Sequence, residues 1–89
     1  MLMSREEIEE FLEEVVGSDA TDILLPDGFD RAFVGATLDP PRAIFSIDLC
    51  VKTLTDQGMG QEDAEEYFWF NVAGSHMGEN TPLFIYTLT

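Results

Sequence analysis

Residues 4–17 carry the pattern that most constrains the fold, an apolar stripe along an otherwise acidic helix. The apolar side chains recur at the i, i+3, i+4, i+7 and i+8 spacing of one helix side: Ile8, Phe11, Leu12, Val15 and Val16. Ser4 and Glu7 have the spacing of a capping box, and Gly17 is a suitable C-cap. The sequence therefore predicts a helix over residues 5–16 that buries one face.

Three later segments have the composition of short strands. Residues 31–38 and 42–46 are rich in strand formers, and "DPP" at 39–41 separates them because neither proline can donate a ladder hydrogen bond. Two such strands around a tight turn predict a β-hairpin. Residues 18–30 before them form a connection, and "LFIYTL" at 83–88 predicts a closing strand.

Two further helices are predicted between the hairpin and the closing strand. Ser46 can cap a helix over about 47–57, which Gly58 ends, and an acidic first turn opens another over about 61–73. The order α-β-β-α-α-β over a single domain, residues 1–89, predicts an α+β fold. We expect a small three-stranded antiparallel sheet with three helices packed mainly on one face.

The charge balance limits the partners that the chain can bind. Eighteen acidic residues against four basic ones give a net charge of −14, while a hydrophobic content of 45% is enough for a core. Such a chain repels nucleic acid and anionic membrane surfaces, because both are bound through Lys and Arg. We therefore expect a basic protein partner, with no direct nucleic-acid binding and no membrane.

The second part of the chain carries a set of short motifs. They are a Gly-Met pair, an acidic helix start, "F-N-V-x-G" and "G-E-x-T-P-x-F", found at Gly58–Met59, Glu62–Ala64, Phe70–Gly74 and Gly78–Phe84. Residues 31–89 with these motifs resemble a family of small phage, prophage and archaeal-virus proteins. The resemblance implies a mobile-element origin and interference with host defence as the class of function. It carries over no settled activity. The single cysteine fits a reducing compartment, so we expect the host cytoplasm.

The exposed side of the first helix is a row of carboxylates: Glu6, Glu9, Glu10, Glu13 and Glu14. Several of these lie three or four residues apart, where like charges destabilise a helix. Glu13 and Glu14 also sit at the negative end of the helix dipole. One interpretation is that the row imitates phosphates and occupies a basic nucleic-acid groove. The other is a solvated face that keeps the protein in solution.

The helix over 61–73 carries a second group of acids. Its core side is expected to hold Ala64, Tyr67, Phe68, Asn71 and Val72. Trp69 falls on the opposite side, one or two turns beyond three acids: Glu62, Glu65 and Glu66. An outward tryptophan among acids favours contact with a basic partner. The alternatives are that Trp69 packs under the tail loop or in a homodimer contact.

Residues for catalysis or metal binding are scarce. Cys50 and His76 are the only pair for a nucleophilic site, and Cys50 lies on an apolar helix face where a thiol is usually buried and inert. No spacing typical of zinc, calcium, phosphate-loop or dinucleotide sites is present. We expect no catalytic residue, no cofactor and no metal, and hence no enzyme.

These observations together predict an interaction protein. It would bind a basic nucleic-acid-handling surface of a host defence system, such as a CRISPR effector or a restriction enzyme, and inhibit it by acidic nucleic-acid mimicry. The alternative is a generic small phage or halophilic structural protein whose acidity serves solubility or salt adaptation. A homodimer stays open in either case, with Trp69 and the sheet edge as the expected contacts.

Overall fold

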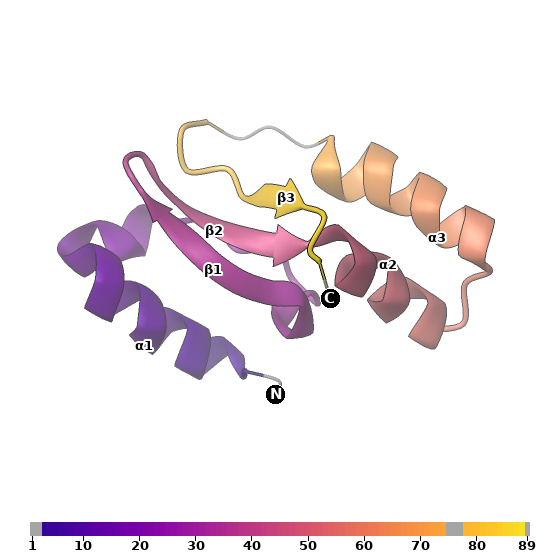
Figure 1. The fold of residues 1–89 in the computed structure, drawn as a ribbon, viewed down its shortest axis with the longest axis horizontal. Coiled ribbons are helices and arrows are strands. Elements are labelled where there is room, and N and C mark those ends of the chain that lie inside the picture. Colours follow the sequence, from indigo (N-terminus) through magenta and orange to yellow (C-terminus); the bar gives the residue numbers. More distant parts are fainter. Residues whose placement is uncertain (1–2, 75–77, 89) are drawn as a thin grey trace.

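The computed structural model describes residues 3–74 and 78–88. Its elements in chain order (Figure 1) are α1 (Arg5–Val16), η1 (Gly17–Asp22), η2 (Asp30–Ala32), β1 (Phe33–Leu38), β2 (Pro41–Ser46), α2 (Ile47–Asp56), α3 (Gln61–Tyr67), η3 (Phe68–Ala73) and β3 (Leu83–Ile85). The first two η elements are 3₁₀ helices and η3 is π-helical. The α+β class and the predicted order of the main elements are confirmed.

The first helix forms as the capping box predicts. The Ser4 backbone N–H donates to Glu7 Oε1 at 2.9 Å, and the Glu7 N–H donates to Ser4 Oγ at 3.2 Å. The hydrogen bond from Ser4 lowers the pKa of the Glu7 carboxyl. Gly17 ends the helix with φ of 78°, which a residue with a Cβ rarely adopts. Ile8 and Leu12 are buried, so the apolar stripe faces the core.

The sheet is mixed, and the predicted all-antiparallel arrangement is wrong for the last strand. β1 and β2 form the expected antiparallel hairpin, but β2 pairs with β3 in parallel, in the order β1-β2-β3. After β2 the chain enters α2, and residues 47–82 carry it back to the end of the sheet where β2 begins. A parallel neighbour requires a long crossover of this kind.

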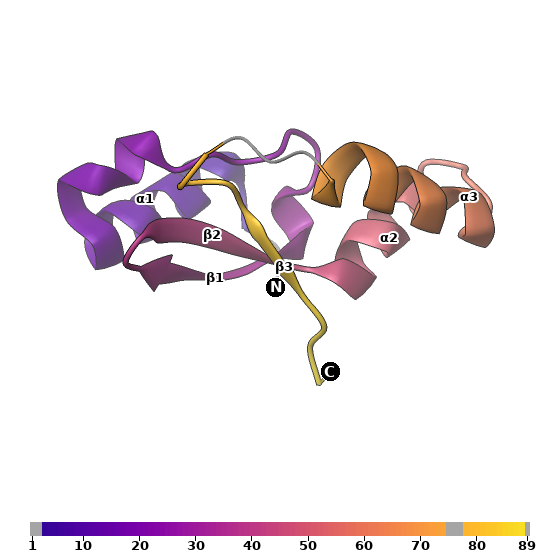
Figure 2. The same cartoon turned by 90° about the horizontal axis from the view of Figure 1, so that it is seen from above.

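One face of the sheet holds the core. Phe33 pairs with Phe45, and Phe45 with Phe84, so the three rings share a face. Ring contacts continue from this face to α1 through Phe11, with a centroid distance of 5.8 Å to Phe33, and to η3 through Phe68, 5.2 Å from Phe84. The pictures show α1 over β1 and β2, with α2 and α3 continuing beyond the strand ends (Figures 1 and 2). Of the three helices, only α1 thus lies over the sheet, whereas α2 and α3 extend beyond it, which differs from the predicted packing of all three mainly on one face.

The helix after the hairpin begins where the sequence places it. Ser46 Oγ accepts the Leu49 N–H at 3.3 Å, which caps α2. Ile47 and Val51 are almost fully buried, and Gly58 follows the helix with φ of 108°. Because α2 starts directly after β2, its first turn lies at the end of the sheet.

The predicted helix over 61–73 changes its winding halfway. It is α-helical only to Tyr67 and then π-helical, with hydrogen bonds to the fifth residue instead of the fourth. Phe68 is buried and Val72 partly so, as expected. The 3.6-residue period predicts Tyr67 and Asn71 on the core side, and this prediction is wrong because both residues are exposed. The last strand ends at Ile85 rather than residue 88.

Candidate functional site

The first candidate surface is the outer side of α1. All five predicted glutamates are exposed there, because the buried Ile8 and Leu12 fix the opposite side against the sheet. We call this set the α1 acidic face: Glu6, Glu9, Glu10, Glu13 and Glu14. The one basic residue of the helix, Arg5, approaches the face only through Glu9, with an Nε–Oε2 distance of 4.0 Å. The last turn has no basic residue.

Three of the four basic side chains form ion pairs with acids outside this face. Arg31 Nη1 lies 2.7 Å from Asp56 Oδ2, and Lys52 Nζ lies 3.6 Å from Asp56 Oδ1. Arg5 Nη1 lies 3.6 Å from carboxylates of Asp27 and Asp30. The hydrogen bond from Arg31, together with the charges of Arg31 and Lys52, lowers the pKa of the Asp56 carboxyl.

Most of the negative charge is therefore uncompensated within the folded chain. Of the 18 acidic residues, which all lie in the described ranges, four form ion pairs there: Glu9, Asp27, Asp30 and Asp56. The other 14 form none with residues 3–74 or 78–88. A surface of this kind attracts a basic partner over about a Debye length, about 8 Å at physiological salt.

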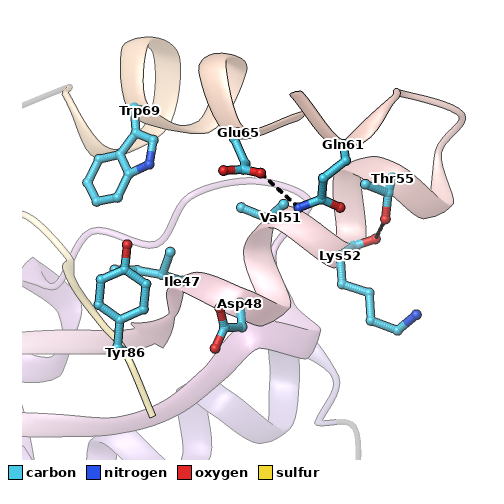
Figure 3. A pocket seen from close by; sticks show the side chains of 9 residues that line it. All are labelled: Ile47, Asp48, Val51, Lys52, Thr55, Gln61, Glu65, Trp69 and Tyr86. Carbon is cyan, nitrogen blue, oxygen red and sulfur yellow. Dashed lines mark hydrogen bonds between the residues drawn. The ribbon is translucent and has the colours of Figure 1, made fainter. Parts of the chain in front are cut away.

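The second candidate surface contains a groove between α2, α3 and the C-terminal segment. Its volume is about 410 Å³. Figure 3 shows its lining, which includes Asp48 and Val51 from α2, Glu65 and Trp69 from the third helix, and Tyr86 from the tail. Two predicted contact residues, Glu65 and Trp69, thus belong to one groove. Glu62 and Glu66 are exposed on the same helix but do not line it.

Trp69 is exposed, as the sequence predicts. The residue is 47% exposed, and an edge contact joins its ring to Phe68 at a centroid distance of 5.1 Å. Phe70, in the π-helical segment, is more exposed, at 81%. Sequence reasoning missed Asp48 and Tyr86. The sequence marks Asp48 only as an acidic residue in the first turn of α2, which indicates a helix start and not a binding site. Nothing in the sequence indicates that Tyr86 lies beside Trp69.

The structure separates the two acidic groups. The molecule measures 39 × 28 × 23 Å, and α1 and α3 lie at opposite ends of its longest dimension (Figures 1 and 2). The nine predicted contact residues therefore form two surfaces and not one.

The residues considered for catalysis or metal binding do not form a described site. Cys50 is buried on α2, and burial raises the pKa of its thiol to about 12. His76 lies outside the described residues, so its pairing with Cys50 stays a hypothesis. Within the described ranges, no three His, Cys, Asp or Glu side chains gather as metal ligands.

The buried thiol leads to a reactivity prediction. At pH 8 the native protein is expected to react with a disulfide-exchange reagent far more slowly than the protein in denaturant, because the thiolate is the reactive form. Absorbance of the released thiol measures both rates. Equal rates for native and denatured protein would contradict the burial of Cys50.

Comparison of the chain with family models, with curated proteins and with solved structures found no match. The resemblance of residues 31–89 to phage and archaeal-virus proteins therefore stays a prediction. In the described part of the chain, no helix combines the length and the apolar character that crossing a bilayer requires.

Proposed function

We propose that the protein is a phage-type inhibitor that binds a basic nucleic-acid-handling surface of a host defence complex in the host cytoplasm. The observation that carries the proposal is the α1 acidic face, an exposed row of glutamates of which only Glu9 forms an ion pair with residues 3–74 or 78–88. The face occupies the place of phosphates in the partner's groove. No chemistry is involved, and affinity comes from carboxylate contacts with Arg and Lys.

The dimensions of the molecule support this proposal. A length of 39 Å corresponds to about 11 base pairs of duplex, which carry about 23 phosphate charges. The chain offers a net charge of −14 over that length. Charge density is thus more than half that of duplex DNA, and it is enough to steer the chain toward a groove built for phosphates.

The partner class follows from the mobile-element resemblance of residues 31–89. A CRISPR effector or a restriction enzyme has a basic groove of the required kind, and blocking it benefits a phage. The protein would then act as an anti-CRISPR or antirestriction DNA mimic.

A second candidate function is salt adaptation, with the chain as a generic small phage or halophilic structural protein. The observation that favours it is the spread of unpaired acids beyond α1, to exposed positions such as Asp22, Asp39 and Glu79. Acidity that serves solubility has no reason to be confined to one face.

Unfolding at low salt separates the two candidates. At about 10 mM salt the Debye length is about 30 Å, so repulsion across the molecule is almost unscreened. The mimicry proposal predicts cooperative thermal unfolding at this salt, because the buried core holds the fold together. Loss of the folded state below molar salt, followed by circular dichroism, would favour salt adaptation instead.

Capture from host-cell lysate tests the proposed function. The native bait is compared with an α1 reversal variant, Glu10→Lys/Glu13→Lys/Glu14→Lys. A matched reversal variant, Asp22→Lys/Asp39→Lys/Glu79→Lys, changes the net charge equally at exposed positions outside α1. Bound proteins are eluted with duplex DNA and identified by mass spectrometry.

The proposal expects a nucleic-acid-handling defence protein on the native and matched baits, released by DNA and absent from the α1 reversal bait. Equal capture by all three baits, or a partner that duplex DNA does not release, would reject mimicry by the α1 acidic face. Loss of capture by both variants would mean that overall charge, and not this face, governs binding.

A further inference from the structure

The groove beside Trp69 has aromatic walls and an apolar floor. Trp69 comes from the π-helical segment and Tyr86 from the tail, and the hydroxyl end of Tyr86 points toward the indole across the groove (Figure 3). Ile47 of α2, 6% exposed, lies beside Tyr86, and Val51, 8% exposed, lies next to Glu65 in the same lining (Figure 3). The contact with Phe68 holds the indole from behind, so the wall is in place before any partner arrives.

Two carboxylates, which belong to different helices, line the groove. Asp48 belongs to α2 and Glu65 to α3, and both line the groove (Figure 3). Asp48 forms no ion pair with the described residues. One oxygen of Glu65 accepts a hydrogen bond from Gln61 Nε2 at 3.0 Å, which leaves the other oxygen available.

The lysine of the groove does not neutralise these carboxylates. The Lys52 side chain extends away from Trp69 and Tyr86 (Figure 3), and its Nζ lies 3.6 Å from Asp56, which is outside the lining. The end of the groove that holds the two aromatic rings is therefore anionic. An anionic recess between aromatic rings is complementary to a cation with a flat apolar surface.

We propose that this groove receives one arginine side chain of the protein partner, an inference that rests on the proposed function. The guanidinium stacks on the exposed ring surfaces of Trp69 and Tyr86, while its N–H groups donate to Asp48 and Glu65. The methylene groups of the arginine lie over Ile47 and Val51. Arginine fits better than lysine because its planar head both stacks and donates in two directions.

The proposal gives the second surface a role in the same complex. The α1 acidic face meets many charges of the partner's groove at one end of the molecule, where no single contact is decisive. The Trp69 groove takes up one side chain at the other end and fixes the position of the protein in the basic groove. Its residues act as an anchor of the kind that aromatic hot spots provide.

The experiment uses Trp69 as its own reporter, since it is the only tryptophan. The ¹⁵N-labelled protein is titrated with acetyl-Gly-Arg-Gly-amide and with acetyl-Gly-Lys-Gly-amide, and the indole N–H resonance is followed. We expect a saturable shift with the arginine peptide and binding at least threefold weaker with the lysine peptide. The absence of an indole shift, or equal binding of both peptides, would overturn the proposal.

Two paired variants distinguish binding of the arginine peptide in the groove from general attraction of the peptide to an acidic protein. Asp48→Asn/Glu65→Gln removes the groove carboxylates, and we expect about a tenfold loss of affinity for the arginine peptide. Asp22→Asn/Glu79→Gln makes the same charge change on exposed positions outside the groove, and we expect native affinity. The backbone amide spectra show that both variants are folded. Equal weakening by the two variants would overturn the proposal.

The test also distinguishes this inference from the proposed function. The α1 reversal variant is expected to bind the arginine peptide like the native protein, because α1 and the groove lie at opposite ends. If the arginine peptide has no effect but a partner is captured and released by DNA, the arginine site is rejected and the proposed function stands. If the arginine peptide binds but no captured partner is released by DNA, nucleic-acid mimicry is rejected and the arginine site stands.

Discussion

Replacing Phe45 with alanine is expected to lower the free energy of unfolding by about 3–5 kcal/mol. The side chain is 1% exposed at the centre of the sheet. Its ring contacts Phe33 at a centroid distance of 5.7 Å and Phe84 at 6.0 Å, so it joins all three strands. A chain of 89 residues has a total stability of about 4–13 kcal/mol, and the loss is therefore a large part of it.

Urea unfolding followed by circular dichroism measures this effect. Phe70→Ala is the matched control, because it removes the same side chain from a position that is 81% exposed. A change of less than about 0.5 kcal/mol is expected for the control. Similar losses for the two variants would show that the aromatic series through Phe45 is not the centre of the core.

The α1 reversal variant is expected to bind the captured partner about 100-fold more weakly than the native protein. Each substitution replaces an attraction of up to about 1 kcal/mol with a repulsion of similar size, a change of up to about 2 kcal/mol. If each substitution has half of this effect, the three together weaken binding by about 3 kcal/mol, which corresponds to about 100-fold in affinity. The matched reversal variant is expected to lose much less. Calorimetric titration with the purified partner measures all three affinities, and equal losses for both variants would contradict a local contact.

The same variant is expected to be more stable than the native protein, by about 1 kcal/mol. Lysines at positions 13 and 14 complement the negative end of the helix dipole, where the native last turn has no basic residue. The substitutions at positions 10 and 13 also replace like-charge pairs with attractive i,i+4 pairs to Glu6 and Glu9. A rise in the thermal midpoint together with lost binding would show that the glutamates serve the partner and not the fold.

The sequence predicts the elements that local interactions determine. The capping box of α1 needs only Ser4 and Glu7, and the cap of α2 needs only Ser46 and the N–H of Leu49, so these boundaries are accurate within a residue. The hairpin is similarly local, since its strands are joined by a short turn. The exposed glutamates of α1 follow directly from the apolar stripe.

The features that sequence reasoning missed depend on tertiary structure. Whether β3 runs parallel or antiparallel to β2 depends on how residues 47–82 cross the molecule. The alternation of side chains along a strand is the same in both cases, so the sequence pattern does not distinguish them. Because β3 is parallel to β2, the chain leaves the sheet beside the start of α2 and brings Tyr86 to the groove. An antiparallel strand would carry Tyr86 to the other end.

The change to π-helical winding accounts for the misplacement of Asn71. After Tyr67 the residues no longer follow the 3.6-residue period, so Asn71 is exposed although that period predicts it on the core side. Trp69 is exposed as predicted and contacts Phe68 with a ring edge, and Phe70 is more exposed still. No residue type in this segment marks the change of winding.

The central claim is that the protein and nucleic acid occupy the same groove of the partner. The most direct measurement is fluorescence anisotropy of a labelled duplex bound to the purified partner, with increasing amounts of the protein added. We predict complete release of the duplex by the native protein and by the matched reversal variant, and no release by the α1 reversal variant at the same concentrations. A complex that holds the duplex and the native protein together would contradict the claim.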